Sequence, residues 1–296
     1  METISKDLLT GERKGMGRRA AMLLGGAALA GMTMSRRASA QAAVTDTDIL
    51  NFALNLEFLE AQFYTLATTG QTIDQAGLSI AGGGGAGGGT VTVKANPMVT
   101  FSTPLLQQFA METAQDEQNH VAFLQKALGA SAVAMPNIDL MNSFNALASA
   151  AGLGASFDPF ASETNFLLGA FIFEDVGVTA YLGAAGLIST AAYLDKAAGI
   201  LAVEAYHAGS IRLRIFQAGS AAESAATSIA TARASLDGTS NDDIGVGLSN
   251  GAATIVDADS NAIAFSRTTA QVLKVVYGGG STGGAFFPNG LNGTIK

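Results

Sequence analysis

Both histidines of this chain stand three positions after a glutamate. Glu117 precedes His120 in the stretch ETAQDEQNHVAFLQ, and Glu204 precedes His207 in the stretch VEAYHAGSIRLRIFQ. Residues three apart lie on one face of an α-helix, so each pair would aim a carboxylate and an imidazole at one point. A single Glu-x-x-His step also occurs on solvent-exposed helices, but here the two steps use every histidine in 296 residues. We therefore expect the two pairs to lie on helices and to form halves of one site.

Four long stretches carry apolar residues at steps of three and four, which is the pattern of amphipathic helices. Asp46 or Thr47 could cap the first helix, and Gly129 ends the second. A shorter helix is expected at residues 139–151, within a long connection between the second and third long helices. This arrangement predicts an all-α protein with a four-helix bundle over residues 45–218. The predicted long helices cover residues 47–66, 104–128, 162–187 and 190–217.

The first and third helices share another motif, a glutamate followed seven positions later by a tyrosine. The pairs are Glu57 with Tyr64 and Glu174 with Tyr181. Together with the two Glu-x-x-His steps they form an internal repeat, in which the same helical hairpin occurs twice. The four glutamates fall on apolar stripes, where an ionised carboxylate costs too much unless it is paired or binds a metal. Four carboxylates would neutralise two divalent cations, so we predict a dinuclear metal site. Its candidate ligands are Glu57, Glu117, His120, Glu174, Glu204 and His207.

This order of ligands resembles the ferritin-like superfamily of di-iron and di-manganese carboxylate proteins. The resemblance implies that Glu117 and Glu204 bridge two metal ions, while Glu57 and Glu174 each bind one of them. Carboxylate and imidazole ligands suit iron and manganese, so two iron ions are expected, with two manganese ions as the alternative.

Glu60 competes with Glu57 as the ligand from the first helix. It lies one turn further along on nearly the same face. The repeat aligns Glu57 with Glu174 but Glu60 with Gly177, and this alignment favours Glu57.

Two longer stretches resemble the desiccation-related proteins of plants and bacteria that carry this domain. They are ILNFALNLEFLEAQFY near the start of the bundle and FSRTTAQVLKVVYGGGSTGGAFFPNGLNG near the end of the chain. The resemblance covers most of residues 45–296. It implies a fold and a metal site but does not specify a reaction.

Two segments outside the long helices have their own character. The glycine run GGGGAGGG is followed by TVTVKANPMVTF, which alternates around an Asn-Pro turn and predicts a β-hairpin at residues 77–102. A flexible linker is the alternative for the glycines.

Residues 219–296 are predicted to form an extension with a short helix at 267–277 capped by Ser266. Phe286 and Phe287 favour packing of its glycine-rich end on the bundle over a disordered tail.

The first 40 residues are typical of a twin-arginine export signal. Arg18 and Arg19 precede an apolar run at residues 20–34, and Ala38, Ser39 and Ala40 form a small-residue cleavage pattern. A permanent anchor is the alternative, but the run is shorter than the roughly 20 residues that a bilayer span needs. We therefore expect a periplasmic or otherwise exported protein without membrane attachment after cleavage.

Charge and composition exclude several function classes. Cleavage would remove seven of the 16 basic and three of the 24 acidic residues, leaving a net charge of −12. A surface of that charge repels phosphate backbones, which argues against nucleic acid as a partner and against a DNA-protecting role. The chain has no cysteine, so disulfides, thiolate metal sites and cysteine nucleophiles are excluded.

Two functions remain for the predicted centre. One is oxidoreductase chemistry on O₂ or peroxide, as ferrous oxidation or peroxide removal in stress protection. In that case Tyr64 and Tyr181 are expected to donate hydrogen bonds to metal ligands rather than to carry radicals. The other is a non-enzymatic envelope protein in which the metal has a structural role. The sequence leaves open whether the chain forms a homo-oligomer.

Overall fold

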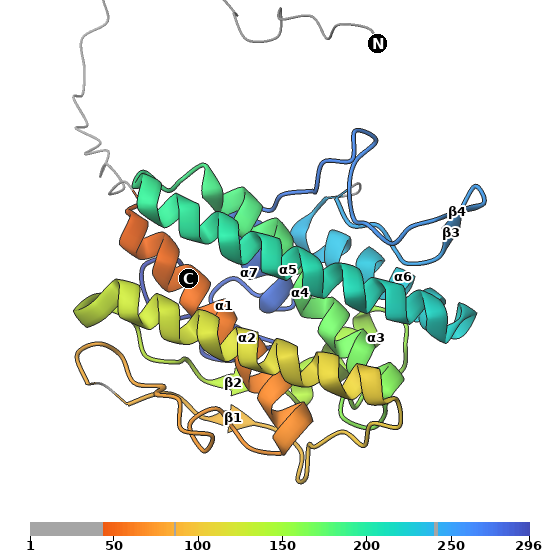
Figure 1. Ribbon diagram of the computed structural model, residues 1–296, viewed down its shortest axis with the longest axis horizontal. Helices are drawn as coiled ribbons and strands as arrows, with labels where there is room; N and C mark the ends of the chain where they lie inside the picture. The colour runs from red at the N-terminus through yellow and green to blue at the C-terminus, as the bar shows by residue number, and fades with distance from the viewer. Residues whose placement is uncertain (1–43, 86, 240–241) are drawn as a thin grey trace, which may run out of the picture. The chain divides into compact units, whose positions relative to one another are not determined.

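The computed structural model describes residues 44–85, 87–239 and 242–296, so the predicted export signal lies outside the described residues. The all-α prediction is confirmed, and four long helices form the centre of the fold (Figure 1). Each begins and ends within a few residues of its predicted range. The long helices are α1 (Asp46–Thr69), α2 (Pro104–Leu128), α4 (Glu163–Ala185) and α5 (Ala191–Ala218).

The four helices form two pairs, because α1 packs along α2 and α4 packs along α5. Helices α1 and α4 are central. Every residue of α1 from Ile49 to Ala67 is buried. Helices α2 and α5 bury only one face each, which explains their mixture of apolar and polar residues.

Within the described residues, α4 alone is long and apolar enough to cross a membrane by length and composition. In its most apolar stretch, 83% of the residues are buried inside the fold. Its composition therefore reflects its position in the core.

Each helix pair supplies the N-terminal cap of the other pair's second helix. Asp46 in α1 accepts hydrogen bonds from the backbone N–H groups of Ser189 (2.8 Å) and Thr190 (2.9 Å), where α5 begins. Glu163 in α4 accepts one from the backbone N–H of Thr103 (2.6 Å), where α2 begins. The first N–H groups of a helix have no partner within the helix, so these carboxylates fix how the two pairs dock.

The cap of α1 itself is Thr45 and not Asp46 or Thr47. The Thr45 side chain accepts from the backbone N–H of Asp48, and the Asp48 carboxylate accepts from the backbone N–H of Thr45. This reciprocal capping box leaves Asp46 available to cap α5.

The predicted β-hairpin at residues 77–102 is wrong. In the described part of this segment the strand is β1 (Val91–Thr92), and it pairs in parallel with β2 (Ile138–Asp139) from beyond α2. The glycines allow this segment to pack closely against the backbone of residues 129–134. A Cβ atom built on Gly83 would come within 2.0 Å of the carbonyl oxygen of Gly129, so no larger residue fits there.

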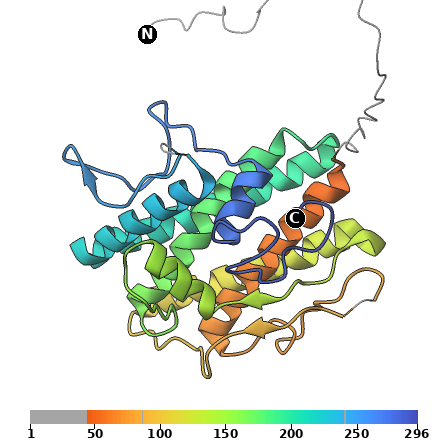
Figure 2. The ribbon, with the colours of Figure 1, turned by 180° about the vertical axis from the view of Figure 1, so that it is seen from behind.

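Helices α6 and α7 pack on a face of α4 that α5 leaves open, whereas the exposed β3–β4 hairpin projects away from the bundle. Figure 2 shows α7 and the C-terminal segment lying across α1 and α4. The cap of α7 is Thr268, which forms a capping box with Gln271, and not Ser266 as expected. The bounds are α3 (Asn142–Ala150), α6 (Ser220–Asp237), β3 (Leu248–Ser249), β4 (Ala252–Ala253) and α7 (Thr269–Val276), with β3 and β4 antiparallel.

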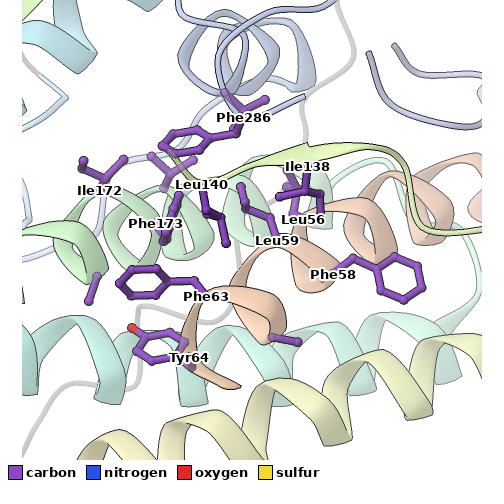
Figure 3. Close-up of a cluster of buried hydrophobic side chains, with 14 of the residues drawn as sticks. Leu56, Phe58, Leu59, Phe63, Tyr64, Ile138, Leu140, Ile172, Phe173 and Phe286 are labelled. Atoms are coloured by element: carbon purple, nitrogen blue, oxygen red, sulfur yellow. The ribbon is translucent and has the colours of Figure 1, made fainter. Parts of the chain in front are cut away.

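The glycine-rich end is anchored by aromatic side chains. Phe286 and Phe287 are both fully buried. The Phe286 ring lies 4.9 Å from that of Phe173 in α4 and 5.2 Å from that of Phe144 in α3, both edge to face. Figure 3 shows Phe286 and Phe173 in contact above Phe63 and Tyr64 of α1. This cluster closes the apolar side of the bundle.

A buried charge network attaches the region after α6 to the helices. Asp175 in α4 accepts hydrogen bonds from Arg212 in α5 (2.9 Å) and from Arg233 in α6 (2.8 Å). Arg233 and Arg267 both donate to Asp243 (2.6 and 2.8 Å). Because these groups are almost completely buried, loss of one partner would leave an uncompensated charge.

Candidate metal centre

The six predicted ligands converge in the middle of the bundle. Each of the four long helices contributes at least one of them, and their carboxylates are completely buried. The two histidines are the most accessible members, with 11% of the His120 side chain and 5% of the His207 side chain exposed. Helical spacing and the docking of the two pairs place these groups together.

One group of ligands surrounds His120. Its Nδ1 atom lies 3.2 Å from Glu57 Oε2, 3.3 Å from Glu117 Oε2 and 3.7 Å from Glu204 Oε1. One ligand atom from each of these four residues lies within 4.8 Å of all the others. The group could therefore hold one metal ion with one nitrogen and three carboxylate ligands.

A second group surrounds His207. Its Nδ1 atom lies 3.1 Å from Glu117 Oε1 and 3.4 Å from Glu174 Oε2. Glu117 presents one oxygen to each histidine, so its carboxylate belongs to both groups. We call the first group the His120 position and the second group the His207 position.

Glu60 also lies at the centre. It is 4% exposed, and its carboxylate forms a third group of potential ligand atoms with Glu174 and Glu204. The sequence argument treated Glu57 and Glu60 as alternatives. The structure places both at the site, on successive turns of α1.

Each tyrosine crosses the bundle to a glutamate of the other helix pair. Tyr64 of α1 donates its hydroxyl hydrogen to Glu174, and Tyr181 of α4 donates its own to Glu57. Burial and the charge of Glu174 raise the pKa of Tyr64 well above its usual value, and burial and Glu57 do the same for Tyr181. Both phenols therefore stay protonated and hold the two carboxylates in place.

The sequence analysis missed one residue at the site, Asp116. Its Oδ2 atom lies 3.3 Å from His207 Nε2, on the side of the ring that faces away from the carboxylates. A hydrogen bond there keeps the proton on Nε2 and leaves Nδ1 as the ligand atom. The position that corresponds to Asp116 in the repeat is Val203, which cannot accept such a bond.

The side chains fit a pair of cations because several of their ligand atoms lack a hydrogen-bond partner. Buried atoms without a hydrogen-bond partner include Glu117 Oε1, Glu174 Oε2, both carboxylate oxygens of Glu204, and His207 Nδ1. Such atoms are costly in a protein interior unless a ligand occupies them. Their concentration at one point is what a dinuclear metal site requires.

The protonation of the centre without metal follows from the same crowding. Burial raises the pKa of Glu117 to about 7 and raises that of Glu204. Burial opposes protonation of the histidines, yet the charges of Glu57 and Glu174 raise the pKa of His120 and of His207 to about 12. Without metal, protons on the carboxylates and positively charged imidazolium rings would thus partly compensate the negative charge of the centre.

Comparisons with known proteins give one family and two relatives. The sequence model of the ferritin-like domain matches residues 45–217. The chain is 28% identical over 269 residues to the ferritin-like catalase Nec2 of Nesocodon mauritianus, an alignment covering 84% of each protein. It is 31% identical over 175 residues to the desiccation-related protein PCC13-62 of Craterostigma plantagineum, covering 58% of this chain and 54% of that protein. No solved structure matches.

Proposed function

Because the chain belongs to the ferritin-like domain family, we propose that its bundle binds two iron or two manganese ions and removes peroxide. The observation that carries the proposal is the pair of buried ligand groups that share Glu117, in which several oxygen atoms have no hydrogen-bond partner. Oxygen and imidazole ligands without any thiolate suit iron and manganese. The likeness to a protein named as a ferritin-like catalase favours peroxide among the small oxidants.

When bound, the metal pair would supply a two-electron cycle that turns two hydrogen peroxide molecules into two waters and one O₂. The residues of the chain would bind the metal ions and orient their ligands. The carboxylates neutralise the cations, and Tyr64 and Tyr181 hold Glu174 and Glu57 in fixed orientations. Because the ligands are almost inaccessible to solvent, the site suits a small neutral substrate better than a large one.

Two related functions remain as alternatives. Ferrous oxidation would use the same ligands with O₂ as the oxidant. A non-catalytic role in desiccation stress is favoured by the similarity to the desiccation-related protein, in which case the metal would only stabilise the bundle. We also propose that the protein works outside the cytoplasm, because the twin-arginine route carries folded proteins with their metals already bound.

The test is to load the purified chain with Fe(II) or Mn(II) without oxygen, then add peroxide and follow O₂ with an electrode. We expect two metal ions per chain and one O₂ released for every two peroxide molecules consumed. Glu112→Gln is the matched control, since Glu112 is an exposed carboxylate on α2. Two bound metals without O₂ release would favour the structural role. Uptake of O₂ on addition of Fe(II) would favour ferrous oxidation.

A further inference from the structure

The two helix pairs are not equivalent where they meet the centre. Glu60 of α1 has Gly177 of α4 as its counterpart in the repeat. Gly177 has ordinary helical backbone, so its conformation does not require glycine. A glycine inside a helix costs about 1 kcal/mol relative to alanine, which calls for another reason to keep it.

Space for carboxylates supplies that reason. A Cβ atom on Gly177 would lie 2.0 Å from Glu204 Oε2 and 3.4 Å from Glu60 Oε1. Glu204 Oε2 therefore occupies the volume that a side chain at position 177 would take, and Glu60 Oε1 lies at van der Waals distance from it. The glycine leaves space beside α4 for the additional carboxylate that α1 supplies.

The two metal positions differ in their number of ligands. Four residues surround the His120 position, but three surround the His207 position, which consists of Glu117, Glu174 and His207. Glu60 forms a group of potential ligand atoms with Glu174, which belongs to the second position, and with Glu204. Among the described residues, neither a hydrogen bond nor an ion pair reaches the Glu60 carboxylate, although the residue is only 4% exposed. An ionised carboxylate in such a place is costly unless a ligand binds it.

We propose that Glu60 is a seventh protein ligand of the metal pair and binds the ion at the His207 position. This inference rests on the proposed dinuclear centre. It replaces the choice between Glu57 and Glu60 with separate roles, because Glu57 binds at the His120 position and Glu60 completes the other. With five carboxylates around two divalent ions the centre carries one net negative charge, which favours a higher oxidation state of the metals.

A structural role for Glu60 is the competing explanation. Its side chain also faces an apolar pocket between α1, α4 and α7, lined by Leu56, Val176, Val275 and Phe286. A buried acid that only fills this space would influence the stability of the protein equally with and without metal. If Glu60 is a ligand, its removal would lower the stability of the metal-bound protein and raise the stability of the metal-free protein.

The experiment compares wild type, Glu60→Gln and the control Glu112→Gln by competitive titration with Mn(II) alone and by melting with and without metal. We expect Glu60→Gln to bind the first ion like wild type and the second at least tenfold more weakly. The variant without metal should melt at a higher temperature than wild type, because one fewer carboxylate is buried among carboxylates. Its gain in melting temperature on adding metal should be smaller.

Unchanged affinity for both ions in Glu60→Gln, with an unchanged gain in melting temperature, would overturn the assignment while leaving the dinuclear centre intact. Equal shifts of melting temperature with and without metal would also overturn it in favour of the structural role. Fewer than two ions in the wild-type protein would overturn both this inference and the proposed function.

Discussion

Tyr64 reaches from α1 to hydrogen-bond Glu174 on α4, and Tyr181 returns the same contact from α4 to Glu57. The tyrosine of each helix pair therefore orients a candidate metal ligand of the other pair. Because each hydrogen bond joins the two pairs, the way in which the pairs dock determines where Glu57 and Glu174 lie. This exchange of hydrogen bonds parallels the exchange of N-terminal caps at the ends of the helices.

The tyrosine contacts should contribute to stability without being required for metal binding. We predict that Tyr64→Phe retains two metal ions per chain but loses about 1–3 kcal/mol of unfolding free energy, because a buried hydrogen bond to a charged group is removed. Chemical denaturation of the metal-loaded protein measures the loss. Tyr206→Phe is the matched control, since Tyr206 is 74% exposed and should show no change. Loss of a metal ion from Tyr64→Phe would contradict this account.

Asp116 should influence one metal position and not the other. We predict that Asp116→Asn weakens binding at the His207 position about 10–100-fold, as for other carboxylates that orient a ligand histidine, and leaves the His120 position unchanged. Stepwise titration with Mn(II) separates the two affinities. Equal weakening of both positions would show that Asp116 acts through overall stability instead.

The four helices, and the meeting of the six candidate ligands in the bundle, could be predicted because both depend on local spacing. Glu117 and His120 share a helical face whatever surrounds them, and a repeated pattern tells which helices belong together. The distinction between Glu57 and Glu60 could not be made in this way. They lie on successive turns of one face, and only the folded structure shows that each carboxylate belongs to a group of potential ligand atoms.

The features that escaped prediction depend on contacts between distant segments. The alternation around Val91 is typical of a strand. Its partner strand at Ile138 lies beyond α2, and no turn motif in the sequence links the two strands. Asp116 was not recognised because its partner, His207, comes from another helix. Asp46 or Thr47 was expected to cap the first helix, whereas Thr45 caps it and Asp46 accepts hydrogen bonds at the start of α5.

Asp257 should make stability fall as pH rises. Burial, with the charge of Asp175 next, raises its pKa to about 7, and one of its oxygens has no partner. Between about pH 4 and pH 7 the folded chain holds a proton here that the unfolded chain has released, so this stabilisation is lost as pH rises. We predict that Asp257→Asn becomes more stable relative to wild type by roughly 2–4 kcal/mol across that window.

Urea denaturation of both proteins at several pH values measures the difference. The side-chain oxygen of asparagine can still accept the hydrogen bond that Ile244 donates from its backbone N–H (2.9 Å). Asp195→Asn, at an exposed position on α5, is the control and should follow wild type. A constant difference between Asp257→Asn and wild type across this pH range would refute the prediction.

Removal of metal should destabilise the bundle at neutral pH. Bound ions stabilise the folded chain by mass action, by about 4 kcal/mol when free metal exceeds its dissociation constant a thousandfold. We therefore expect a chelator to lower the melting temperature and metal to restore it. Identical melting curves with and without chelator would mean that the carboxylates hold no metal under these conditions.

The most direct test of the dinuclear centre is the metal content of chains that lack the histidines. We predict two ions per wild-type chain, loss of mainly one ion in either His120→Ala or His207→Ala, and no dinuclear binding in the double variant. Alanine is a good helix former, so circular dichroism should show intact helices in all of them. Two metal ions per chain in the double variant, measured by elemental analysis after desalting, would contradict the central claim that the two Glu-x-x-His steps build one metal site.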